Sequence, residues 1–208
     1  MRHPFPSRDS HVNSYGVRAF DHAMGLIDML GLKEWRARTA HGIQGTVLEL
    51  GAGSGRNAPW LKDDAVVIAL DPDLELLRFQ RAKGRLRGPA IVAVGEALPF
   101  RNSAFDAALA TLVLCSVEDQ RRVALELKRT LRVGGVLHAI DHVASSALTL
   151  ERLQQRLAPS WYRMTAGCRI DRHTVDVLQA EGFEVTHRDN ALKGVFIRYE
   201  AAPRTTTA

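Results

Sequence analysis

The fold is indicated by residues 47–57, which read VLELGAGSGRN. An apolar run predicts a buried strand, and the loop after it carries glycine at positions 51, 53 and 55. Glycine adopts backbone torsions that other residues avoid, and it lets a ligand approach the main chain closely. This stretch therefore predicts a strand, a ligand-binding turn and then a helix.

Further short apolar runs follow along the chain, separated by segments with helical spacing. Strands that are apolar on both faces are typical of a parallel sheet covered by helices. The pattern predicts an α/β fold, a Rossmann-like doubly wound sheet of seven mostly parallel strands. The strands are expected at residues 46–50, 65–70, 90–94, 107–112, 136–140, 183–188 and 195–200.

Helix signals lie between these runs. One helix is expected to begin near Pro72, with Asp71 as a natural N-cap, and to stop at Gly84. A second is expected to begin at Ser116, where Asp119 stands in the position of a capping box. A third is expected from Asp171 to Gly182.

The domain organisation expected is one single domain over residues 15–202, between a disordered tail at 1–14 and a short tail at 203–208. Apolar residues at helical spacing predict an N-terminal helical lid over 15–40, which Gly25 and Gly31 weaken. Residues 144–170 break the strand–helix alternation. They predict an insertion after the fifth strand, on the acceptor side of the sheet, where doubly wound folds bind ligands.

Composition narrows the class of protein. Of 208 residues, 46% are hydrophobic and 25% are charged, which is ordinary for a globular domain. No apolar run is long enough to span a membrane, and the N-terminal residues lack the apolar core of a signal peptide, so a cytoplasmic location is expected. Two cysteines predict neither a disulfide framework nor a multi-cysteine zinc site, and no metal is expected.

The net charge is +5, and five basic residues fall between Arg78 and Arg87. Such a run indicates either a solvated helix face or a surface for an anionic partner. Nucleic acid is not expected, because only Phe79 accompanies the basic residues as a stacking side chain. Transient contact with an anionic membrane surface stays open.

Two acidic residues suggest which ligand the turn binds. Glu49 stands two residues before the first glycine, where a carboxylate would repel a pyrophosphate but attract the cationic end of a sulfonium cofactor. Asp71, at the end of the second strand, is placed to accept hydrogen bonds from ribose hydroxyls. Arg56 stands where the dinucleotide fingerprint requires a glycine, so S-adenosylmethionine is favoured over NAD. An NAD-dependent oxidoreductase remains the distant alternative.

The chain resembles class I S-adenosylmethionine-dependent methyltransferases with a methyltransferase type 11 domain, of the kind that includes the ubiquinone and menaquinone C-methyltransferases. The resemblance rests on LELGAGSGRN, IALDPD, VGEALPF, FDAALATLVLCSV and LRVGG, over about residues 46–141. It implies that the cofactor is held by Glu49, Gly51, Ala52, Gly53, Asp71, Pro72, Gly95, Glu96, Thr111 and Leu112. Within this set the resemblance implies that Gly95 and Glu96 flank the adenine. Many members have an aspartate where this chain has Val94, so adenine recognition is expected to rest on the Gly95 backbone and on Glu96.

A second similarity extends into the insertion. TLVLCSV, IDHVA, APSW and AGC look like the small thiol methyltransferases of the methyltransferase-like group. This similarity implies a small-molecule acceptor, a thiol or an amine. Bacterial phospholipid N-methyltransferases share much of the same pattern, so a phospholipid or natural-product N-, O- or C-methyltransferase remains the alternative.

Acceptor-side residues are expected at the ends of strands four and five and in the two helical segments. His142 is a candidate general base at neutral pH, or a structural histidine, and Asp141 is a candidate to orient it. These two are the predicted catalytic residues. The acceptor pocket is expected to include Tyr15, Phe20, Cys115, Trp161 and Cys168.

Overall fold

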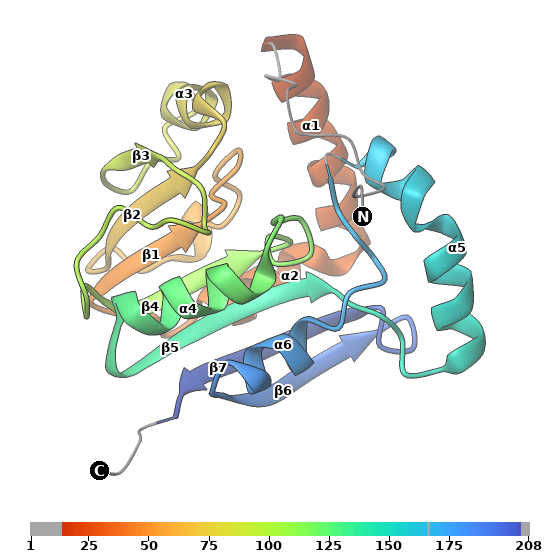
Figure 1. The fold of residues 1–208 in the computed structure, drawn as a ribbon. Coiled ribbons are helices and arrows are strands. Elements are labelled where there is room, and N and C mark those ends of the chain that lie inside the picture. The colour runs from red at the N-terminus through yellow and green to blue at the C-terminus, as the bar shows by residue number, and fades with distance from the viewer. Residues whose placement is uncertain (1–13, 166, 205–208) are drawn as a thin grey trace.

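The structure is a computed structural model that describes residues 14–165 and 167–204 (Figure 1). Its seven strands are β1 (Thr46–Leu50), β2 (Val66–Asp71), β3 (Ala90–Val92), β4 (Phe105–Thr111), β5 (Leu131–His142), β6 (Phe183–Ala191) and β7 (Phe196–Pro203). They form one sheet in the order β3-β2-β1-β4-β5-β7-β6. Strands β1 to β5 run parallel, and β7 is antiparallel to both of its neighbours. The predicted seven-stranded, mostly parallel sheet is confirmed.

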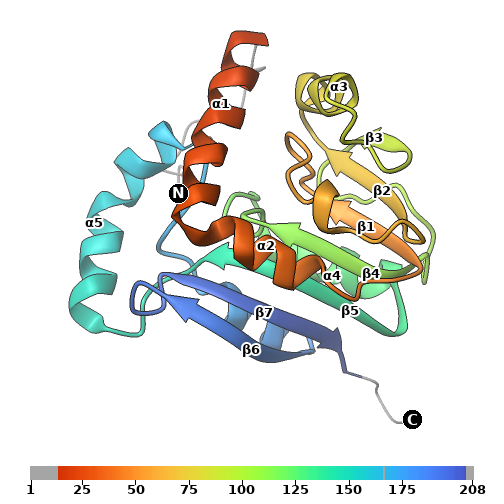
Figure 2. The same ribbon diagram turned by 180° about the vertical axis from the view of Figure 1, so that it is seen from behind.

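Helices cover both faces of this sheet, with α4 and α6 on the face seen in Figure 1 and α2 on the face seen in Figure 2. The helical elements are α1 (Ser14–Ile27), the π-helical turn η1 (Asp28–Leu32), α2 (Lys33–Ala40), the 3₁₀ turn η2 (Ala58–Trp60), α3 (Leu74–Ala82), α4 (Gln120–Thr130), α5 (Leu148–Met164) and α6 (Thr174–Ala180). Of the predicted tails, residues 1–13 and 205–208 lie outside the described residues, whereas Ser14 begins α1 and Pro203 ends β7.

The core lies on both sides of the central strand β1. Successive side chains of a strand point to opposite faces, and both faces of β1 are buried. Leu48 packs into the cluster that contains Val123 and Leu127 of α4. Val47 packs on the other side, in the cluster with Ile43. This double burial explains why the strand reads as continuously apolar.

The start of α3 differs from the prediction. The helix begins at Leu74, and the cap is Asp73, whose Oδ1 accepts hydrogen bonds from the backbone N–H groups of Glu75 and Leu76. The expected start near Pro72 with Asp71 as cap was wrong, because the two carboxylate oxygens of Asp71 accept from other backbone groups. The predicted stop at Gly84 is confirmed, since this glycine has φ +64° just after the helix.

Two further helices begin later than expected. Helix α4 starts at Gln120 with Asp119 as its N-cap, because the preceding residues form a tight turn in which Ser116 N donates to Val113 O at 2.7 Å. Helix α6 starts at Thr174 rather than at Asp171. The residues before it are held away from helical geometry by a hydrogen bond from Ala144 N to Arg172 O, at 2.8 Å.

The N-terminal helical segment is bent rather than straight. Gly31 has φ +116° within η1, so the helical lid expected over residues 15–40 divides into α1 and α2. Helix α1 is tied to the rest of the domain by Asp21, whose carboxylate Oδ1 lies 3.0 Å from Arg56 Nε and 2.9 Å from Arg85 Nη1. These ion pairs hold the predicted lid against the glycine loop.

The insertion after β5 forms α5 and the loop that follows it, beside α1 in both ribbon views (Figures 1 and 2). Buried Gln154 anchors the helix. Its Nε2 donates to Val143 O at 2.9 Å and to Ile170 O at 2.7 Å, while its Oε1 accepts from Ser145 N. One side chain thus joins the start, middle and end of the insertion.

Candidate functional site

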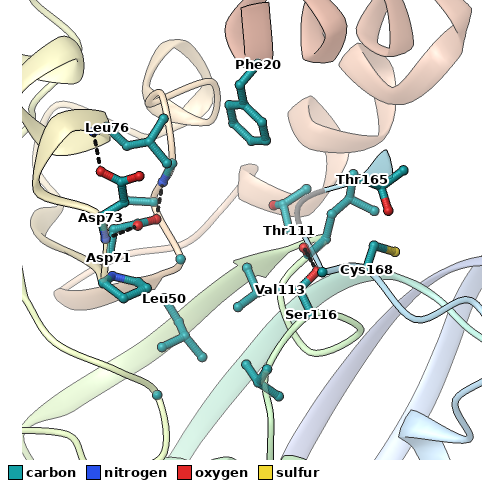
Figure 3. A pocket seen from close by; sticks show the side chains of 18 of the residues that line it. Phe20, Leu50, Asp71, Asp73, Leu76, Thr111, Val113, Ser116, Thr165 and Cys168 are labelled. Carbon is teal, nitrogen blue, oxygen red and sulfur yellow. Dashed lines mark hydrogen bonds between the residues drawn. The ribbon is translucent and has the colours of Figure 1, made fainter. Parts of the chain in front are cut away.

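A cavity of about 800 Å³ opens at the carboxyl ends of the parallel strands (Figure 3). This volume is typical of a site for a small molecule or a cofactor. Asp71 and Asp73 stand at one side in Figure 3, Cys168 and Thr165 at the other, and Phe20 of α1 lies between them. The predicted cofactor residues that line the cavity are Gly51, Ala52, Gly53, Asp71, Pro72, Gly95, Glu96, Thr111 and Leu112.

The loop that carries Gly51, Gly53 and Gly55, called the glycine cradle below, has a backbone conformation that residues with side chains rarely adopt. Gly51 has φ +61°, and a Cβ atom there would lie 2.5 Å from Cγ2 of Val113. Gly53 has φ +56° and faces Phe20 of the lid, with room for one methyl group. The loop is attached to β2 by a hydrogen bond from Ala52 N to Leu70 O, at 3.0 Å. Main-chain atoms are therefore exposed to a ligand, as a nucleoside site requires.

Asp71 is held in a fixed orientation beside this loop. Its Oδ2 accepts from Gly53 N at 2.9 Å and its Oδ1 from Asp73 N at 2.8 Å. A carboxylate has about four acceptor positions, and Asp71 lines the cavity where a ribose would lie. The role of Asp71 at the ribose stays a prediction, and the geometry is compatible with it.

Glu49 lies beneath the cavity wall rather than in it. Its side chain is 3% exposed, and its Oε1 accepts from Asn57 Nδ2 at 2.9 Å. Asn57 Oδ1 accepts in turn from Arg36 Nη1 at 2.9 Å and from Thr111 Oγ1 at 3.2 Å. Burial raises the pKa of Glu49 to about 7, although Asn57 and the charge of Arg36 oppose this rise. The carboxyl group therefore titrates near neutral pH.

Sequence reasoning missed Arg36 and Asn57 as parts of the site. Both line the cavity and both are buried, and a second bond from Arg36 Nε to Asp28 Oδ1, at 2.9 Å, fixes the guanidinium. Asn57 was visible at the end of the quoted glycine stretch. Arg36 carried no local signal, because it reaches the site only through the bend at Gly31.

The expected adenine end is built from Gly95 and Glu96. The Glu96 Oε1 accepts from the backbone N–H groups of Glu118 and Asp119, at 2.8 and 3.2 Å, so this carboxylate links the loop after β3 to the start of α4. Val94, at the position where the resemblance leads one to expect an aspartate, is 47% exposed and lines the cavity. Contact of this end with adenine stays a prediction.

Trp161, Cys168 and His142 line the other end of the cavity, and Phe20 lines its middle, opposite Gly53. The ring of His142 packs against Phe196 at a tilt of 49°, with 3.9 Å between centroids, and it meets Trp161 edge to face at 6.1 Å. Tyr15 belongs to α1, but its side chain lies outside the described part of the structure.

Cys115 does not line the cavity. It is fully buried behind Cys168, with 3.6 Å between the two sulfur atoms. The prediction that Cys115 belongs to the pocket wall was therefore wrong, because Cys168 lies between it and the cavity. The hydrogen bond between the two thiols and burial both raise the pKa of Cys115. The same hydrogen bond lowers the pKa of Cys168, whose sulfur also lies 3.3 Å from His142 Nδ1.

Asp141 is fully buried and lies beneath the cavity lining. Its Oδ1 accepts from Cys115 N at 3.2 Å and its Oδ2 from the Tyr199 hydroxyl at 2.8 Å. Burial raises the pKa of Asp141 to about 6, against the lowering effect of these hydrogen bonds. The Asp141 carboxylate thus connects β5 to β7 and to the loop that follows β4. Its hydrogen bonds position the backbone at Cys115 in this loop, and they do not reach the acceptor end of the cavity.

The basic run is largely engaged with carboxylates. Arg78 pairs with Glu75 at 2.6 Å, Arg85 with Asp21, and Arg87 with Asp63. These pairs favour the solvated-face interpretation over an anionic partner. Within residues 14–165 and 167–204, none of the helices combines the length and apolarity needed to cross a membrane.

Comparisons with known proteins agree with this arrangement. The family model described as a methyltransferase domain matches residues 48–139. The solved structure of an S-adenosylmethionine-dependent methyltransferase from Thermotoga maritima superposes with a TM-score of 0.71 at 21% identity, covering 93% of this chain and 99% of the other. The YcgJ protein of Bacillus subtilis gives 0.68 at 16% identity, covering 89% and 99%.

Two curated relatives are thiol S-methyltransferases. TMT1B of Rattus norvegicus is 35% identical over 148 residues, which is 67% of this chain and 61% of the relative. TMT1A of Homo sapiens is 32% identical over 145 residues, 66% of this chain and 59% of the relative. The chain thus spans about three fifths of the length of these relatives. The match of residues 48–139 to a methyltransferase domain, the sheet order and the glycine cradle agree with one another, and the fold is that of the class I S-adenosylmethionine-dependent methyltransferases.

Proposed function

We propose that the protein transfers the methyl group of S-adenosylmethionine to the sulfur of a small thiol. The observation that carries this proposal is the continuity of one cavity from the glycine cradle and Asp71 to His142 and Cys168. A nucleoside at the first end and an acceptor at the second would share this space. The similarity to two thiol S-methyltransferases supports sulfur as the acceptor atom.

The residues at the acceptor end favour a neutral, partly apolar molecule. The part of α5 and its following loop that lines the cavity contributes Trp161, Tyr162, Arg163, Thr165, Gly167 and Cys168. None of these described lining residues is acidic, and Arg163 is basic. An ammonium substrate would need a carboxylate here to compensate its lost hydration. A thiol does not, which favours it over an amine.

The cavity fits the cofactor, because it is lined by Gly51, Gly53 and Asp71, and the Val113 side chain packs so closely on Gly51 that no side chain could stand there. When bound, S-adenosylmethionine supplies an electrophilic methyl group on a positively charged sulfur. The chain holds the acceptor in line with that methyl group, and such positioning can remove roughly 7–11 kcal/mol from a barrier. Phe20 of the lid and Trp161 of the insertion limit the access of water from both sides.

A thiol must lose its proton to become a good nucleophile. His142 is the ionisable side chain at this end of the cavity with a ring nitrogen, Nε2, directed away from Cys168, whose sulfur approaches Nδ1. In this proposal, His142 accepts the proton of the acceptor thiol. The alternative acceptors, a phospholipid headgroup or a natural-product amine, phenol or carbon, would need a deprotonation at the same place.

The test is a transfer assay with isotopically labelled S-adenosylmethionine and a panel of alkyl thiols, amines, phenols and dispersed phospholipids, with products identified by mass spectrometry. We expect label in thioethers. A Glu49→Gln variant should lose transfer, and Glu184→Gln, at an exposed carboxylate on β6, is the matched control. Label in amines, phenols or lipids but not in thiols would reject the sulfur acceptor. The absence of cofactor binding would reject the activity altogether.

A further inference from the structure

Three side chains suited to bind a soft metal ion meet behind the acceptor end of the cavity. Cys115 follows β4, His142 ends β5, and Cys168 follows α5. Their candidate ligand atoms, two sulfurs and one ring nitrogen, all lie within 4.8 Å of one another. All three residues are buried, at 0%, 7% and 6% exposure. This cluster is more compact than the packing of three unrelated side chains requires.

The distances match those of a tetrahedral zinc site. Zn–S bonds of about 2.3 Å and Zn–N bonds of about 2.0–2.1 Å imply roughly 3.8 Å between two sulfurs and roughly 3.6 Å between sulfur and nitrogen. The sulfurs of Cys115 and Cys168 are 3.6 Å apart, and Cys168 Sγ is 3.3 Å from His142 Nδ1. These two pairs would change by a few tenths of an ångström on binding the ion, and the third pair, Cys115 Sγ and the His142 ring nitrogen, lies within 4.8 Å and would close around it.

The surroundings hold the three ligand atoms in place. Close packing against Phe196 restricts the His142 ring, and Asp141 accepts a hydrogen bond from the backbone N–H of Cys115. The carbonyl of Cys115 accepts from Arg169 N at 2.9 Å, which connects the Cys115 loop directly to the residue after Cys168. Metal sites depend on such supporting contacts to orient their ligands.

We propose that Cys115, His142 and Cys168 bind one Zn²⁺ ion whose fourth coordination position faces the cavity and receives the acceptor thiol as a thiolate. The second half of this proposal rests on the proposed function. Two thiolates and a neutral imidazole neutralise the charge of Zn²⁺, which suits a buried site. Three protein ligands with one open position are typical of catalytic rather than structural zinc. His142 and Cys168 line the cavity while Cys115 closes the site behind them, so the open position faces the acceptor.

Zinc coordination would replace general-base catalysis by His142, since Nδ1 would bind the ion and Nε2 would carry the proton. The acceptor thiol would lose its proton to solvent as it binds zinc, because a coordinated thiol is deprotonated near neutral pH. Its sulfur then forms the new S–CH₃ bond. The bond between the methyl carbon and the sulfonium sulfur breaks, and its electron pair stays on the departing S-adenosylhomocysteine. Atoms and charge balance, with one proton released.

The site was not expected from the sequence. Cys168 lies 26 residues from His142 and 53 from Cys115. Structural zinc sites are recognised in sequences by pairs of ligands two to five residues apart, and these spacings are far longer. The cluster exists only because parallel strands β4 and β5 end side by side and the insertion returns over them.

The test begins with metal binding alone. The full chain, stripped of metal and kept reduced with a phosphine, is titrated with Co²⁺, which substitutes for zinc and absorbs visible light. We expect one equivalent to bind with thiolate-to-metal charge-transfer absorption and the bands of a tetrahedral ion, and Zn²⁺ to displace it. Cys115→Ser, Cys168→Ser and His142→Gln should each lose this spectrum, whereas His173→Gln, at an exposed histidine, should retain it.

Folding is checked in each variant by circular dichroism and by S-adenosylhomocysteine binding. Cys168→Ser, at the cavity side of the cluster, is the informative variant if Cys115→Ser does not fold. An unchanged cobalt spectrum in a folded Cys168→Ser protein, or no thiolate-to-cobalt absorption in the parent, would overturn the site.

A final measurement separates this proposal from the proposed function. Adding a small alkyl thiol to the cobalt protein should shift its spectrum, and zinc should raise the rate of thiol methylation. Metal binding with the expected spectrum but no methylated thiol would leave the site standing and reject the thiol activity. Equal methylation by metal-free and zinc-loaded protein, with no cobalt spectrum, would reject the site and leave the activity standing.

Discussion

Asn57 donates through Nδ2 to Oε1 of Glu49 at 2.9 Å, in the buried layer directly beneath the glycine cradle. The other end of the same amide accepts from Arg36 Nη1. A neutral amide thus stands between a buried carboxyl group and a buried guanidinium. The hydrogen bond from Asn57 therefore stabilises the charged form of Glu49, and no direct ion pair with Arg36 neutralises this charge. The carboxylate can still attract a cationic ligand in the cavity above it.

Replacing Glu49 by glutamine should weaken cofactor binding about 10- to 100-fold, because a hydrogen bond or contact with a charged group contributes about 1.5–3 kcal/mol. The glutamine can still accept from Asn57, so the thermal midpoint should not fall. Isothermal titration with S-adenosylmethionine and S-adenosylhomocysteine measures the effect, with Glu184→Gln as control. Parent-like affinity in Glu49→Gln would contradict a role for the buried charge.

Cofactor affinity should rise with pH between about 6 and 8. Burial raises the pKa of Glu49 to about 7, with Arg36 and Asp71 as the charged neighbours that act on it. A cation binds the ionised form better, so the cofactor displaces a proton below pH 7. Titrations at several pH values, in buffers of different ionisation enthalpy, detect this release. In the Glu49→Gln variant, the cofactor affinity should no longer rise with pH over this range.

The same titration has the opposite effect on the stability of the cofactor-free protein. Since the folded-state pKa of Glu49 lies above its ordinary 4.5, its contribution to stability is complete below that ordinary value and is lost as pH rises through about 7. Denaturant unfolding at pH 5.5 and 8 should show a larger decrease for the parent than for Glu49→Gln. An equal decrease in both proteins would assign the pH dependence to other groups.

Replacing Gly51 by alanine should lower the unfolding free energy much more than replacing Gly84 by alanine. Both glycines have positive φ, at +61° and +64°, where an added side chain costs about 1–2 kcal/mol. Gly84 has open space, whereas the new Cβ at Gly51 would overlap Val113. Gly51→Ala should therefore lose a further 1–3 kcal/mol or so in unfolding free energy, and its cofactor binding. Equal losses in the two variants would show that the cradle adapts.

Tyr199→Phe should lower the unfolding free energy by about 1–3 kcal/mol, because it removes the hydroxyl that donates to Asp141 Oδ2 and leaves a buried acceptor unsatisfied. Cofactor binding should be preserved, since neither residue lines the cavity. Urea denaturation and titration calorimetry on the same preparation check the two halves. Loss of cofactor binding without loss of stability would place Tyr199 in the site instead.

Asp21→Asn should loosen the lid. The substitution weakens the pairs with Arg56 and Arg85 that attach α1 to the glycine loop. We expect faster amide hydrogen exchange in α1 and faster release of S-adenosylhomocysteine in stopped-flow measurements. Glu34→Gln, which breaks the exposed Glu34–Arg38 pair on α2, is the matched control. Identical release rates in Asp21→Asn and the control would show that the lid is held by other contacts.

Residues close together in sequence determined much of this protein. The apolar run before Gly51 determined strand β1 with its observed bounds, and the glycines with Asp71 indicated a nucleoside cradle at the strand ends. These features depend on backbone torsions and on the burial of both faces of a strand, which local sequence encodes. The start of α3 was harder to predict, because the sequence alone makes Asp71 and Asp73 equally good N-caps. In the structure, Asp71 accepts a hydrogen bond from Gly53 of the glycine loop, and Asp73 is the cap.

The tertiary structure alone decided which distant side chains meet. Arg36 reaches Asn57 through the bend at Gly31, and Cys115, His142 and Cys168 converge from three separate segments. Such contacts follow from the order of strands in the sheet and the path of the insertion across it. Periodicity and motif spacing describe neighbours along the chain, whereas these interactions are between neighbours in space, and packing of the whole sheet selects them.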